Sequence, residues 1–334
     1  MIAGVHAQAI GAVEGARLVG VVSRSAERGA AFLEKHGGDT VASSVEELVA
    51  QPGIDVVCIT TPSGAHLEPA LVAIAAGKHL VVEKPIEITT ARVDELLAAS
   101  SAVGVRVAPI FQQRFSEGAQ ALKAAIVAGR FGRLTSAGCY AKWFREESYY
   151  TGSNWKGTVK YDGGGAVMNQ GIHGVDLLQW LVGLPEEVMG YTTRRVHQGI
   201  EVEDTAVASL RFPDGALGTI EATTAAWPGW AMRIEICGEN GSARLEDGVI
   251  TEWKFRDEAA DGANSAGGDA GLGSGAANPA GISIEGHRRQ IADMVAAVAE
   301  DRPLAIEGPA ARNAVALINA LYVSAASGRP EKVS

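Results

Sequence analysis

The sequence predicts two domains: a doubly wound α/β domain with a parallel sheet, then an α+β domain with a large, mainly antiparallel sheet. From Leu18 to about Val107, strand-like and helix-like segments alternate, which is the order found in parallel sheets. After about Ile110, strand-like segments follow one another. A chain of 334 residues also exceeds what one core usually supports. We therefore expect domains at 1–109 and 110–334.

The segment DVVCITT at 55–61 carries the parallel-sheet prediction, because it is almost wholly apolar, as a strand buried on both faces requires. A glycine, Gly77, follows the next helical segment and suits a helix end. In the first domain we expect strands at 18–23, 55–61, 79–85 and 105–110, and helices at 26–36, 45–50, 66–76 and 92–101.

In the second domain, the turn sequences PDG and ENG predict hairpins between neighbouring strands. We expect strands at 134–144, 188–196, 205–212, 216–227, 232–237, 243–245 and 249–255. Helices are expected at 120–129, 165–182, 284–300 and 310–327. The stretch 149–163 reads as a loop, and 259–281, rich in Gly, Ala and Ser, as a flexible surface loop.

The composition limits the kinds of partner that the protein is expected to bind. A net charge of −10 disfavours a nucleic-acid partner, which needs a basic face. No apolar run reaches the roughly 18 residues of a membrane span, so no membrane partner is expected. The three cysteines, Cys58, Cys139 and Cys237, are far apart, which suits a reducing, cytoplasmic location.

Polar residues after the first apolar strand bear on cofactor choice. Ser23, Arg24, Ser25 and Arg28 stand where a ribose is usually held by an acid. Arginines and hydroxyls there favour a 2′-phosphate, and so NADP(H) slightly over NAD(H). The alternative is a solvated helix start with Ser23 or Ser25 as N-cap.

Two other strand ends carry candidate groups. Thr60 and Thr61, followed by Pro62, can offer hydroxyls and backbone N–H groups to a ribose or pyrophosphate beside a helix start, or form a plain strand–helix junction. Lys84, in the sequence Glu83-Lys84-Pro85, would be a proton donor or acceptor if partly desolvated. The alternative is an ordinary exposed lysine.

The stretch GGGAVMNQGIHGVD, from Gly163 to Asp176, is the most informative one in the second half. Its helical spacing places Asn169, His173 and Asp176 on one face. This polar stripe is either functional or a structural histidine bonded to Asp176. We expect no metal site, because the seven histidines are scattered along the chain.

These segments together resemble the glucose–fructose oxidoreductase/inositol dehydrogenase (Gfo/Idh/MocA) family. The resemblance spans essentially the whole chain and rests on IAGVHAQAI, TTPSGAHLEPALVAIAAGKHLVVEKP, the Gly-rich helix and the closing helices. It implies an N-terminal Rossmann domain and a C-terminal α+β domain whose open sheet commonly forms a dimer face. A homodimer or homotetramer is thus expected.

The resemblance also implies residue roles. Lys84 corresponds to the catalytic lysine, often followed by a cis bond to Pro85, and His173 to the catalytic histidine. Asn169 stands where an Asp is common, and an amide orients a hydroxyl but takes no proton. The expected cofactor-binding set is Ile2, Ser23, Arg24, Arg28, Thr60, Thr61, Pro62, His66, Glu83, Lys84 and Gln112.

The family opens with a strand and a G-x-G-x-x-A/G turn, and Met1 falls inside that motif, with Ala3 at its third glycine position. Either the start codon was assigned too late, or the chain lacks its central strand. We expect the first, because a missing central strand would expose apolar edges.

The expected activity is NAD(P)-dependent hydride transfer to or from a ring carbon of a sugar, sugar derivative or cyclitol. Expected substrate contacts are Arg114, Tyr149, Trp155, Lys156 and Asp176. Arg114 could instead form a structural ion pair, and the loop residues could make dimer contacts. Two other functions stay open: NAD-assisted cleavage of a glycosidic bond, and a non-catalytic, dinucleotide-sensing regulator.

Overall fold

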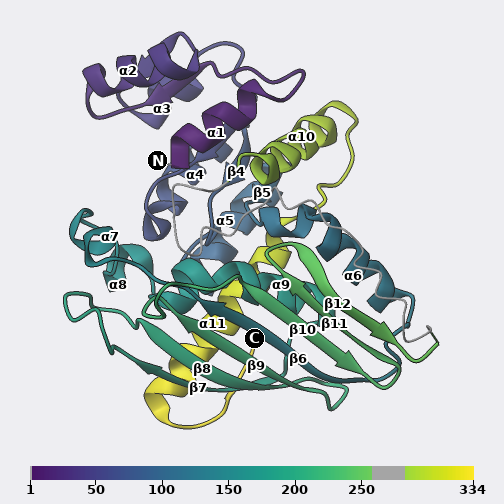
Figure 1. Ribbon diagram of the computed structural model, residues 1–334. Helices are drawn as coiled ribbons and strands as arrows, with labels where there is room; N and C mark the ends of the chain where they lie inside the picture. The colour runs from purple at the N-terminus through teal and green to yellow at the C-terminus, as the bar shows by residue number, and fades with distance from the viewer. Residues whose placement is uncertain (1, 258–282) are drawn as a thin grey trace. The chain divides into compact units, whose positions relative to one another are not determined.

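The computed structural model describes residues 2–257 and 283–334 (Figure 1). It divides the chain into two compact units. The first unit holds Met1–Glu87, Ala91–Gln112 and Ile284–Ala311, and the second holds Ile88–Thr90, Gln113–Ser283 and Arg312–Ser334. The expected loop at 259–281 lies outside the described residues.

The first unit contains short parallel strands in two separate sheets. One sheet pairs β1 (Gly20–Val22) with β2 (Thr40–Ala42), and the other has the order β3 (Val56–Ile59), β4 (His79–Val82), β5 (Val107–Pro109). Leu80, Val81 and Val82 of β4 are fully buried, as the apolar pattern predicted for strands covered on both faces. The α/β class with parallel strands is confirmed.

The helices of this unit are α1 (Ile2–Gly11), α2 (Ala26–His36), α3 (Val45–Val49), α4 (Leu67–Ala75), α5 (Thr90–Val103) and α10 (Glu285–Ala299). A 3-10 turn, η1 (Ser63–Ala65), precedes α4. Helix α2 begins where Ser25 Oγ accepts a hydrogen bond from Arg28 N at 3.3 Å. An N-cap of this kind satisfies a backbone donor that the first helical turn leaves free.

Helix α10 belongs to the first unit although residues 113–283 separate its segment from the preceding part of that unit, Ala91–Gln112. Its Met294 and Ala297 pack against Val81 and Ala108, and its Ile291 packs against Ala9 of α1. Sequence periodicity predicted this helix but placed it with the second domain. Which sheet a helix covers depends on contacts distant in sequence, which local patterns do not carry.

The second unit is built on an eight-stranded sheet in the order β12-β11-β10-β6-β9-β8-β7-β13. Of its neighbouring pairs, β6 and β9 run parallel and the others antiparallel, which confirms a mainly antiparallel sheet. The strands are β6 (Leu134–Lys142), β7 (Glu187–Thr193), β8 (Thr205–Arg211), β9 (Leu217–Thr223), β10 (Arg233–Gly238), β11 (Gly241–Glu246), β12 (Val249–Phe255) and β13 (Glu331–Lys332).

Helices cover one face of this sheet (Figure 1). Alternate residues of β8, namely Ala206, Ala208 and Leu210, are buried, and those between them are more exposed. Helix α9 approaches so closely that a Cβ at Gly174 would lie 2.4 Å from Cys139 Sγ. The helical segments are η2 (Gln112–Phe115), α6 (Glu117–Val127), α7 (Glu147–Thr151), α8 (Val159–Asp162), η3 (Ala166–Gly171), α9 (Ile172–Val182) and α11 (Gly308–Ser327).

Two local expectations need correction. The stretch 149–163 contains α8 and the end of α7, because Thr158 Oγ1 caps the amide of Tyr161 and starts a short helix. The helix expected over 165–182 begins with a π-helical segment, η3, before α9. Such segments disturb the 3.6-residue period on which the sequence prediction depended.

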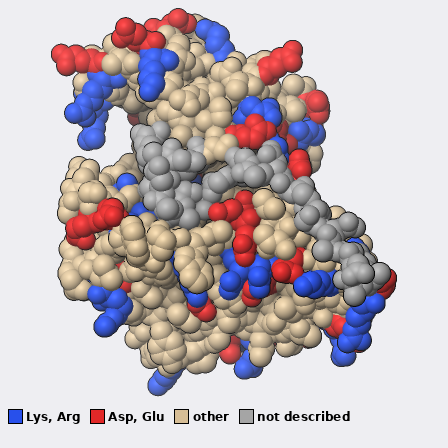
Figure 2. Space-filling view, in the orientation of Figure 1, with Lys and Arg blue, Asp and Glu red and all other residues tan. Residues whose placement is uncertain are grey.

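Charged side chains of both signs are interspersed over the face drawn in Figure 2. Within the described part of the chain, no helix has the length and apolarity required to cross a bilayer.

Candidate active site

Lys84 lies just beyond the end of β4, on the edge where parallel sheets bind ligands. Its side chain is half-buried, its amide donates to Glu83 Oε2 at 3.1 Å, and its peptide bond to Pro85 is cis. The residue is thus neither fully exposed nor enclosed. This position suits a group that exchanges a proton with a ligand at the sheet edge.

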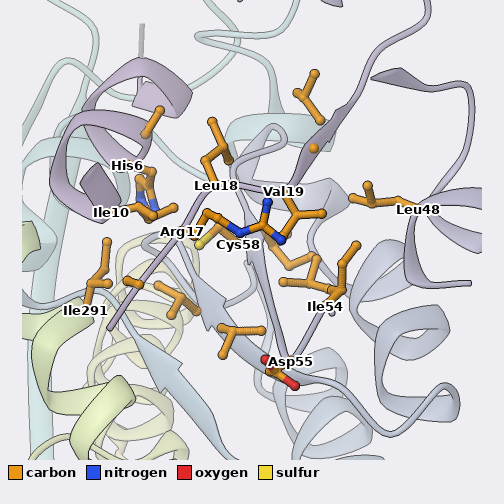
Figure 3. Close-up of a pocket in the computed structure, with 18 of the residues that line it drawn as sticks. His6, Ile10, Arg17, Leu18, Val19, Leu48, Ile54, Asp55, Cys58 and Ile291 are labelled. Carbon is orange, nitrogen blue, oxygen red and sulfur yellow. The ribbon is translucent and has the colours of Figure 1, made fainter. Parts of the chain in front are cut away.

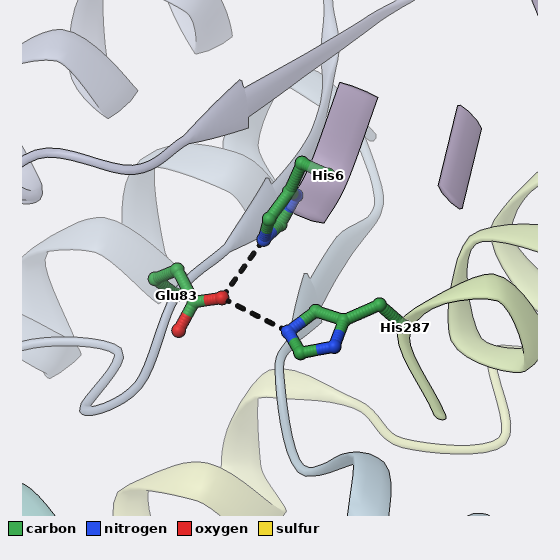
Figure 4. Close-up of side chains that lie close together, drawn as sticks. All are labelled: His6, Glu83 and His287. Carbon is green, nitrogen blue, oxygen red and sulfur yellow. Dashed lines mark hydrogen bonds and ion pairs between the residues drawn. The ribbon is translucent and has the colours of Figure 1, made fainter. Parts of the chain in front are cut away.

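Glu83 is held by two histidines distant in sequence (Figure 4). His6 Nε2 lies 2.8 Å and His287 Nε2 3.3 Å from the same oxygen, Glu83 Oε1, and all three residues are buried. Burial opposes charge on His6, but hydrogen bonds with Cys58 and Glu83 outweigh it and raise the pKa of His6 to about 10. Burial likewise opposes the charge of Glu83, yet the two histidines hold its pKa well below the usual range.

The ligand atoms of His6, Glu83 and His287 lie within 4.8 Å of one another, which would permit a metal ion. In the structure each of the two histidines instead directs its Nε2 at the same carboxylate oxygen, Glu83 Oε1. The contacts fit a hydrogen-bonded charge network better than a ligand set. We interpret the cluster as the anchor that fixes Glu83, and with it the position of Lys84.

His66 connects the loops that follow β3 and β4. Its Nδ1 lies 2.9 Å from Pro85 O and its Nε2 3.0 Å from Thr61 O. Burial lowers the pKa of this imidazole. Both ring nitrogens therefore face carbonyl groups of the protein. The cofactor contact expected of His66 would then be indirect, through the position of the two loops.

The candidate groups for the adenosine end lie at the end of β1. Ser25 Oγ caps α2, and Ser23 Oγ donates to Ser25 O at 2.7 Å. Arg24 and Arg28 are exposed and, among the described residues, form no ion pair. The N-cap alternative thus holds for Ser25, whereas both guanidinium groups stay available to an anion.

The other expected cofactor contacts are spread over the first unit. Thr61 Oγ1 donates to Ala65 O at 2.7 Å and shapes the turn after Pro62, whereas Thr60 has a half-buried side chain. Ile2 opens α1. Gln112 is buried, and its Oε1 has no hydrogen-bond partner among the described residues. A buried polar atom of this kind is a candidate contact for a ligand.

In the second unit, Asn169 and His173 lie on the continuous helical segment η3–α9. Asn169 Nδ2 donates a short hydrogen bond to Asp162 Oδ1, while Asp162 Oδ2 accepts from Gly157 N at 2.7 Å. Asn169 and Asp162 are buried and His173 is half-buried. The bond to Asp162 uses the NH₂ group of the amide and fixes the orientation of the Asn169 side chain.

Glu203 fixes the start of this helical segment. Its carboxylate accepts from Gly165 N at 2.8 Å, Val167 N at 2.9 Å and Tyr322 Oη at 2.9 Å. Burial raises the pKa of this carboxyl, although the three hydrogen bonds oppose the shift. Sequence reasoning found neither Asp162 nor Glu203, because their partners lie on other elements. The position of Asp162 directly before the three glycines was the one available signal.

Cations surround Tyr149. Lys156 Nζ lies 3.5 Å from the centre of its ring, and Arg145 Cζ lies 5.5 Å away. Tyr149 Oη accepts from Gln170 Nε2 at 3.2 Å, and burial raises the pKa of the phenol. The structure therefore brings the expected contacts Tyr149 and Lys156 together and adds Arg145, which the sequence did not single out. Trp155, the residue before Lys156, is half-buried.

Arg114 and Asp176 are bonded to each other. Arg114 Nε lies 2.7 Å from Oδ2 and Nη2 lies 2.5 Å from Oδ1, with the side chains 4% and 1% exposed. Asp176 also accepts from Gln179 Nε2 at 3.2 Å. This geometry matches the structural ion pair left open for Arg114 rather than the substrate contact expected for both residues.

The parallel sheet and the strand-end groups define a dinucleotide-binding oxidoreductase, and comparison with known proteins agrees. Residues 1–111 match a model described as "Oxidoreductase family, NAD-binding Rossmann fold", and residues 119–244 match the "GFO/IDH/MocA C-terminal domain". The chain belongs to the Gfo/Idh/MocA family.

Individual relatives act on sugars and cyclitols. The chain is 33% identical to the WlbA dehydrogenase of Bordetella pertussis, solved with NADH and UDP-GlcNAcA, at a TM-score of 0.89 with 100% of this chain and 95% of that chain covered. It is 31% identical to a 1,5-anhydro-D-fructose reductase of Ensifer adhaerens over 62% of each sequence, less than two thirds of that protein. A myo-inositol 2-dehydrogenase of Thermotoga maritima is 27% identical, with 77% of this chain and 76% of that protein covered.

Proposed function

We propose that this oxidoreductase interconverts a hydroxyl and a carbonyl at a ring carbon of a sugar or sugar derivative, with NAD(H) or NADP(H). The observation that carries the proposal is the buried Asn169, which lies on the helical segment that bears His173 and is hydrogen-bonded to Asp162 at the end of α8. It presents an oriented hydroxyl acceptor one helical turn from an imidazole. Lys84, at the end of β4, is the second proton-exchanging group.

The residues divide the chemistry as follows. A bound nicotinamide supplies the hydride acceptor or donor. Asn169 orients the reacting hydroxyl through its carbonyl oxygen, and Asp162 keeps the amide from rotating. His173 takes the hydroxyl proton as the carbonyl forms and passes it to solvent, and Lys84 is proposed as the second group able to hold a proton of the substrate. In the reverse direction both proton transfers run backwards.

The first unit offers groups that fit a dinucleotide. Backbone N–H groups of the first turn of α1 suit a pyrophosphate, and the buried oxygen of Gln112 suits an amide donor. We propose a modest preference for NADP, because exposed Arg24 and Arg28 can pair with a 2′-phosphate. Titration of both cofactors into the wild type and Arg24→Ala tests this. The preference is refuted if the ratio of the two Kd values is the same in both proteins.

We further propose that the substrate is an acidic, nucleotide-linked sugar. Two observations support this: the WlbA relative was solved with UDP-GlcNAcA, and Arg145 and Lys156 place two cations beside the aromatic ring of Tyr149. Arginine binds carboxylates and phosphates in a bidentate manner, and an aromatic face packs against sugar C–H groups.

The test is a cofactor-reduction assay with UDP-GlcNAcA, with neutral UDP-GlcNAc and with myo-inositol. We expect turnover with the acidic nucleotide sugar at a kcat/KM at least about tenfold above the neutral one, corresponding to one charged hydrogen bond. Arg145→Met should remove that difference. Turnover of myo-inositol alone would retain the dehydrogenase and refute the acidic substrate. No turnover of any of the three, with cofactor bound, would count against the proposed function.

Assembly and location are proposed on separate grounds. Tyr191, Val207 and Leu217 expose apolar side chains on strands of the large sheet, which suits association of two copies. Sedimentation of Leu217→Lys against the wild type tests for a dimer. The three cysteines are free thiols in the structure, and we propose a cytoplasmic location from them.

A further inference from the structure

A cavity of about 510 Å³ in the first unit is lined mostly by apolar side chains, among them Ile10, Leu48 and Ile54 (Figure 3). Such a lining offers few hydrogen-bond donors to a charged sugar. The second unit contrasts with it, because cationic side chains there gather around Tyr149. Trp143 adds a buried N–H donor to that group, which makes this part of the second unit a candidate site for an anion.

Trp143 is buried, and its N–H group lacks an acceptor. The residue is 3% exposed, and its indole Nε1 has no hydrogen-bond partner among the described residues. A buried donor of this kind is unfavourable unless a ligand or an ordered water accepts its hydrogen bond. A phenylalanine would fill most of the same space without that cost, so the N–H group itself indicates an acceptor.

The register of the large sheet places Trp143 beside η3. Ala141 of β6 pairs with Ala222 of β9, and Trp143 N continues this pairing by donating to Thr223 O. A Cβ at Gly171, the last residue of η3, would lie 3.1 Å from that of Ala222, so η3 packs directly on this part of the sheet. Residues two apart along a strand share a face. The side chain of Trp143 therefore lies on the helix-covered face, just beyond the end of β6.

A continuous set of side-chain contacts leads from Trp143 back to the same helical segment. Arg145 Cζ lies 5.0 Å from the centre of the Trp143 ring and 5.5 Å from that of Tyr149. Tyr149 Oη in turn accepts from Gln170 Nε2 at 3.2 Å, and Gln170 belongs to η3. The unsatisfied indole donor, the guanidinium and the phenol thus surround one region of the second unit.

This region carries positive charge where water is largely excluded. Arg145 is 5% exposed, and burial lowers the pKa of its guanidinium because the charged form loses hydration. Lys156 Nζ lies 3.5 Å from the centre of the Tyr149 ring. An anionic acceptor beside Arg145 would offset the lost hydration and would satisfy the N–H group of Trp143 at the same time.

A carboxylate suits these groups better than a diphosphate. It is planar and matches the donor pair of a guanidinium, which already lies against a planar indole. It also carries a single charge, so its removal from water into a buried region costs less than that of a diphosphate with two charges.

We propose that Trp143 is a specificity-determining residue, whose indole N–H donates to the carboxylate of an acidic sugar that Arg145 also binds. The inference rests on the proposed function and deepens it. Gln170 directly follows Asn169, the residue proposed to orient the reacting hydroxyl, so the carboxylate contact and the reacting carbon belong to the same sugar ring. Trp143 takes no part in proton transfer.

The kinetic experiment uses Trp143→Phe, which removes the N–H group and keeps an aromatic ring against Arg145. The matched control is Trp180→Phe, because the ring of Trp180 also lies against an arginine, with Arg114 Cζ at 5.4 Å. We expect KM for UDP-GlcNAcA to rise about tenfold or more in Trp143→Phe, with kcat changed less than about threefold, as for a lost hydrogen bond to a charged group. KM for neutral UDP-GlcNAc should stay at its wild-type value, and the control should change neither.

A second measurement uses the wild type and depends neither on turnover nor on the folding of the variant. Indole N–H signals of the six tryptophans are followed by NMR on protein with ¹⁵N-labelled Trp, while D-glucuronate or uncharged D-glucose is added. The signal of Trp143 is identified by its absence from Trp143→Phe or, should that variant not fold, by exclusion with Trp→Phe variants at the other positions. We expect D-glucuronate to shift this signal saturably and D-glucose to leave it in place.

The outcomes separate this inference from the proposed function. A Trp143 signal that neither D-glucuronate nor UDP-GlcNAcA moves overturns the inference, because the N–H group would then serve a buried water alone. Wild-type KM for UDP-GlcNAcA in Trp143→Phe, or an equal rise in KM for the acidic and the neutral nucleotide sugar, overturns it as well and leaves the dehydrogenase intact. A response to D-glucuronate without turnover of UDP-GlcNAcA supports the carboxylate site and counts against the proposed function alone.

Discussion

Removing one partner of the Arg114–Asp176 pair separates a structural role from a role in substrate binding. The pair is bidentate, at 2.7 and 2.5 Å, and the two side chains are 4% and 1% exposed. Arg114→Met would leave the carboxylate of Asp176 buried with only Gln179 as a hydrogen-bond partner of its side chain in the described contacts. Breaking a buried pair in this way costs about 3–5 kcal/mol.

The double variant Arg114→Met/Asp176→Leu removes both charges and should recover most of that loss, because buried ion pairs are often replaceable by apolar side chains at little cost. The free energy of unfolding is measured by urea denaturation for the wild type, both single variants and the double variant. A coupling energy of several kcal/mol is expected, since the two groups contact each other directly.

Kinetics complete the test. With a structural pair, the folded fraction of each variant should keep the wild-type KM. The reasoning is refuted if Arg114→Met unfolds at the wild-type urea concentration while its KM rises about tenfold or more, the effect expected for a lost charged contact to a ligand.

Three further predictions address the site. Lys84→Ala and His173→Ala should each lower kcat by about 10²- to 10⁴-fold, the usual range for general acid–base groups, in a cofactor-reduction assay; near-wild-type kcat in both would contradict the assignment. Asp162→Ala should lower kcat because Asn169 is no longer oriented, Asn169→Ala should lower it at least as much, and unchanged kcat in Asp162→Ala would argue against an orienting role. Because the pKa of His6 is raised to about 10 from 6.5, its stabilisation is full below about pH 6.5 and declines as the pH rises toward 10; His6→Gln should flatten this decline in unfolding measurements between pH 7 and 10.

Sequence patterns predicted the elements whose signals are local. The apolar run at 55–61 contains β3 (Val56–Ile59), and the serine before 26–36 is the N-cap of α2. Strand alternation and turn sequences likewise predicted the antiparallel neighbours of the second unit. Burial on two faces, N-caps and hairpin turns are all properties of a few consecutive residues, so they can be read before the fold is known.

The parts that sequence did not predict depend on pairing between distant residues. Glu203 caps the helical segment from 38 residues away, and His287 reaches Glu83 across 204 residues. The same limit explains why α10 was placed with the wrong neighbours. Roles of individual site residues stay predictions, because proton transfer depends on a bound substrate as well as on these contacts.

The networks around the two proton-exchanging residues share one physical principle. Lys84 follows a carboxylate fixed by two buried histidines, and His173 lies on a helix whose start is fixed by Glu203 and whose Asn169 is oriented by Asp162. In each case a buried acid, bonded to groups far along the chain, sets the orientation of a reactive neighbour. Buried charges are costly unless fully bonded, so these contacts favour one arrangement over its alternatives. Positioning of this kind lowers the cost of reaching a reactive geometry. Variants of Glu83, Asp162 and Glu203 should consequently reduce kcat through misplaced neighbours even though none of the three needs to contact the substrate.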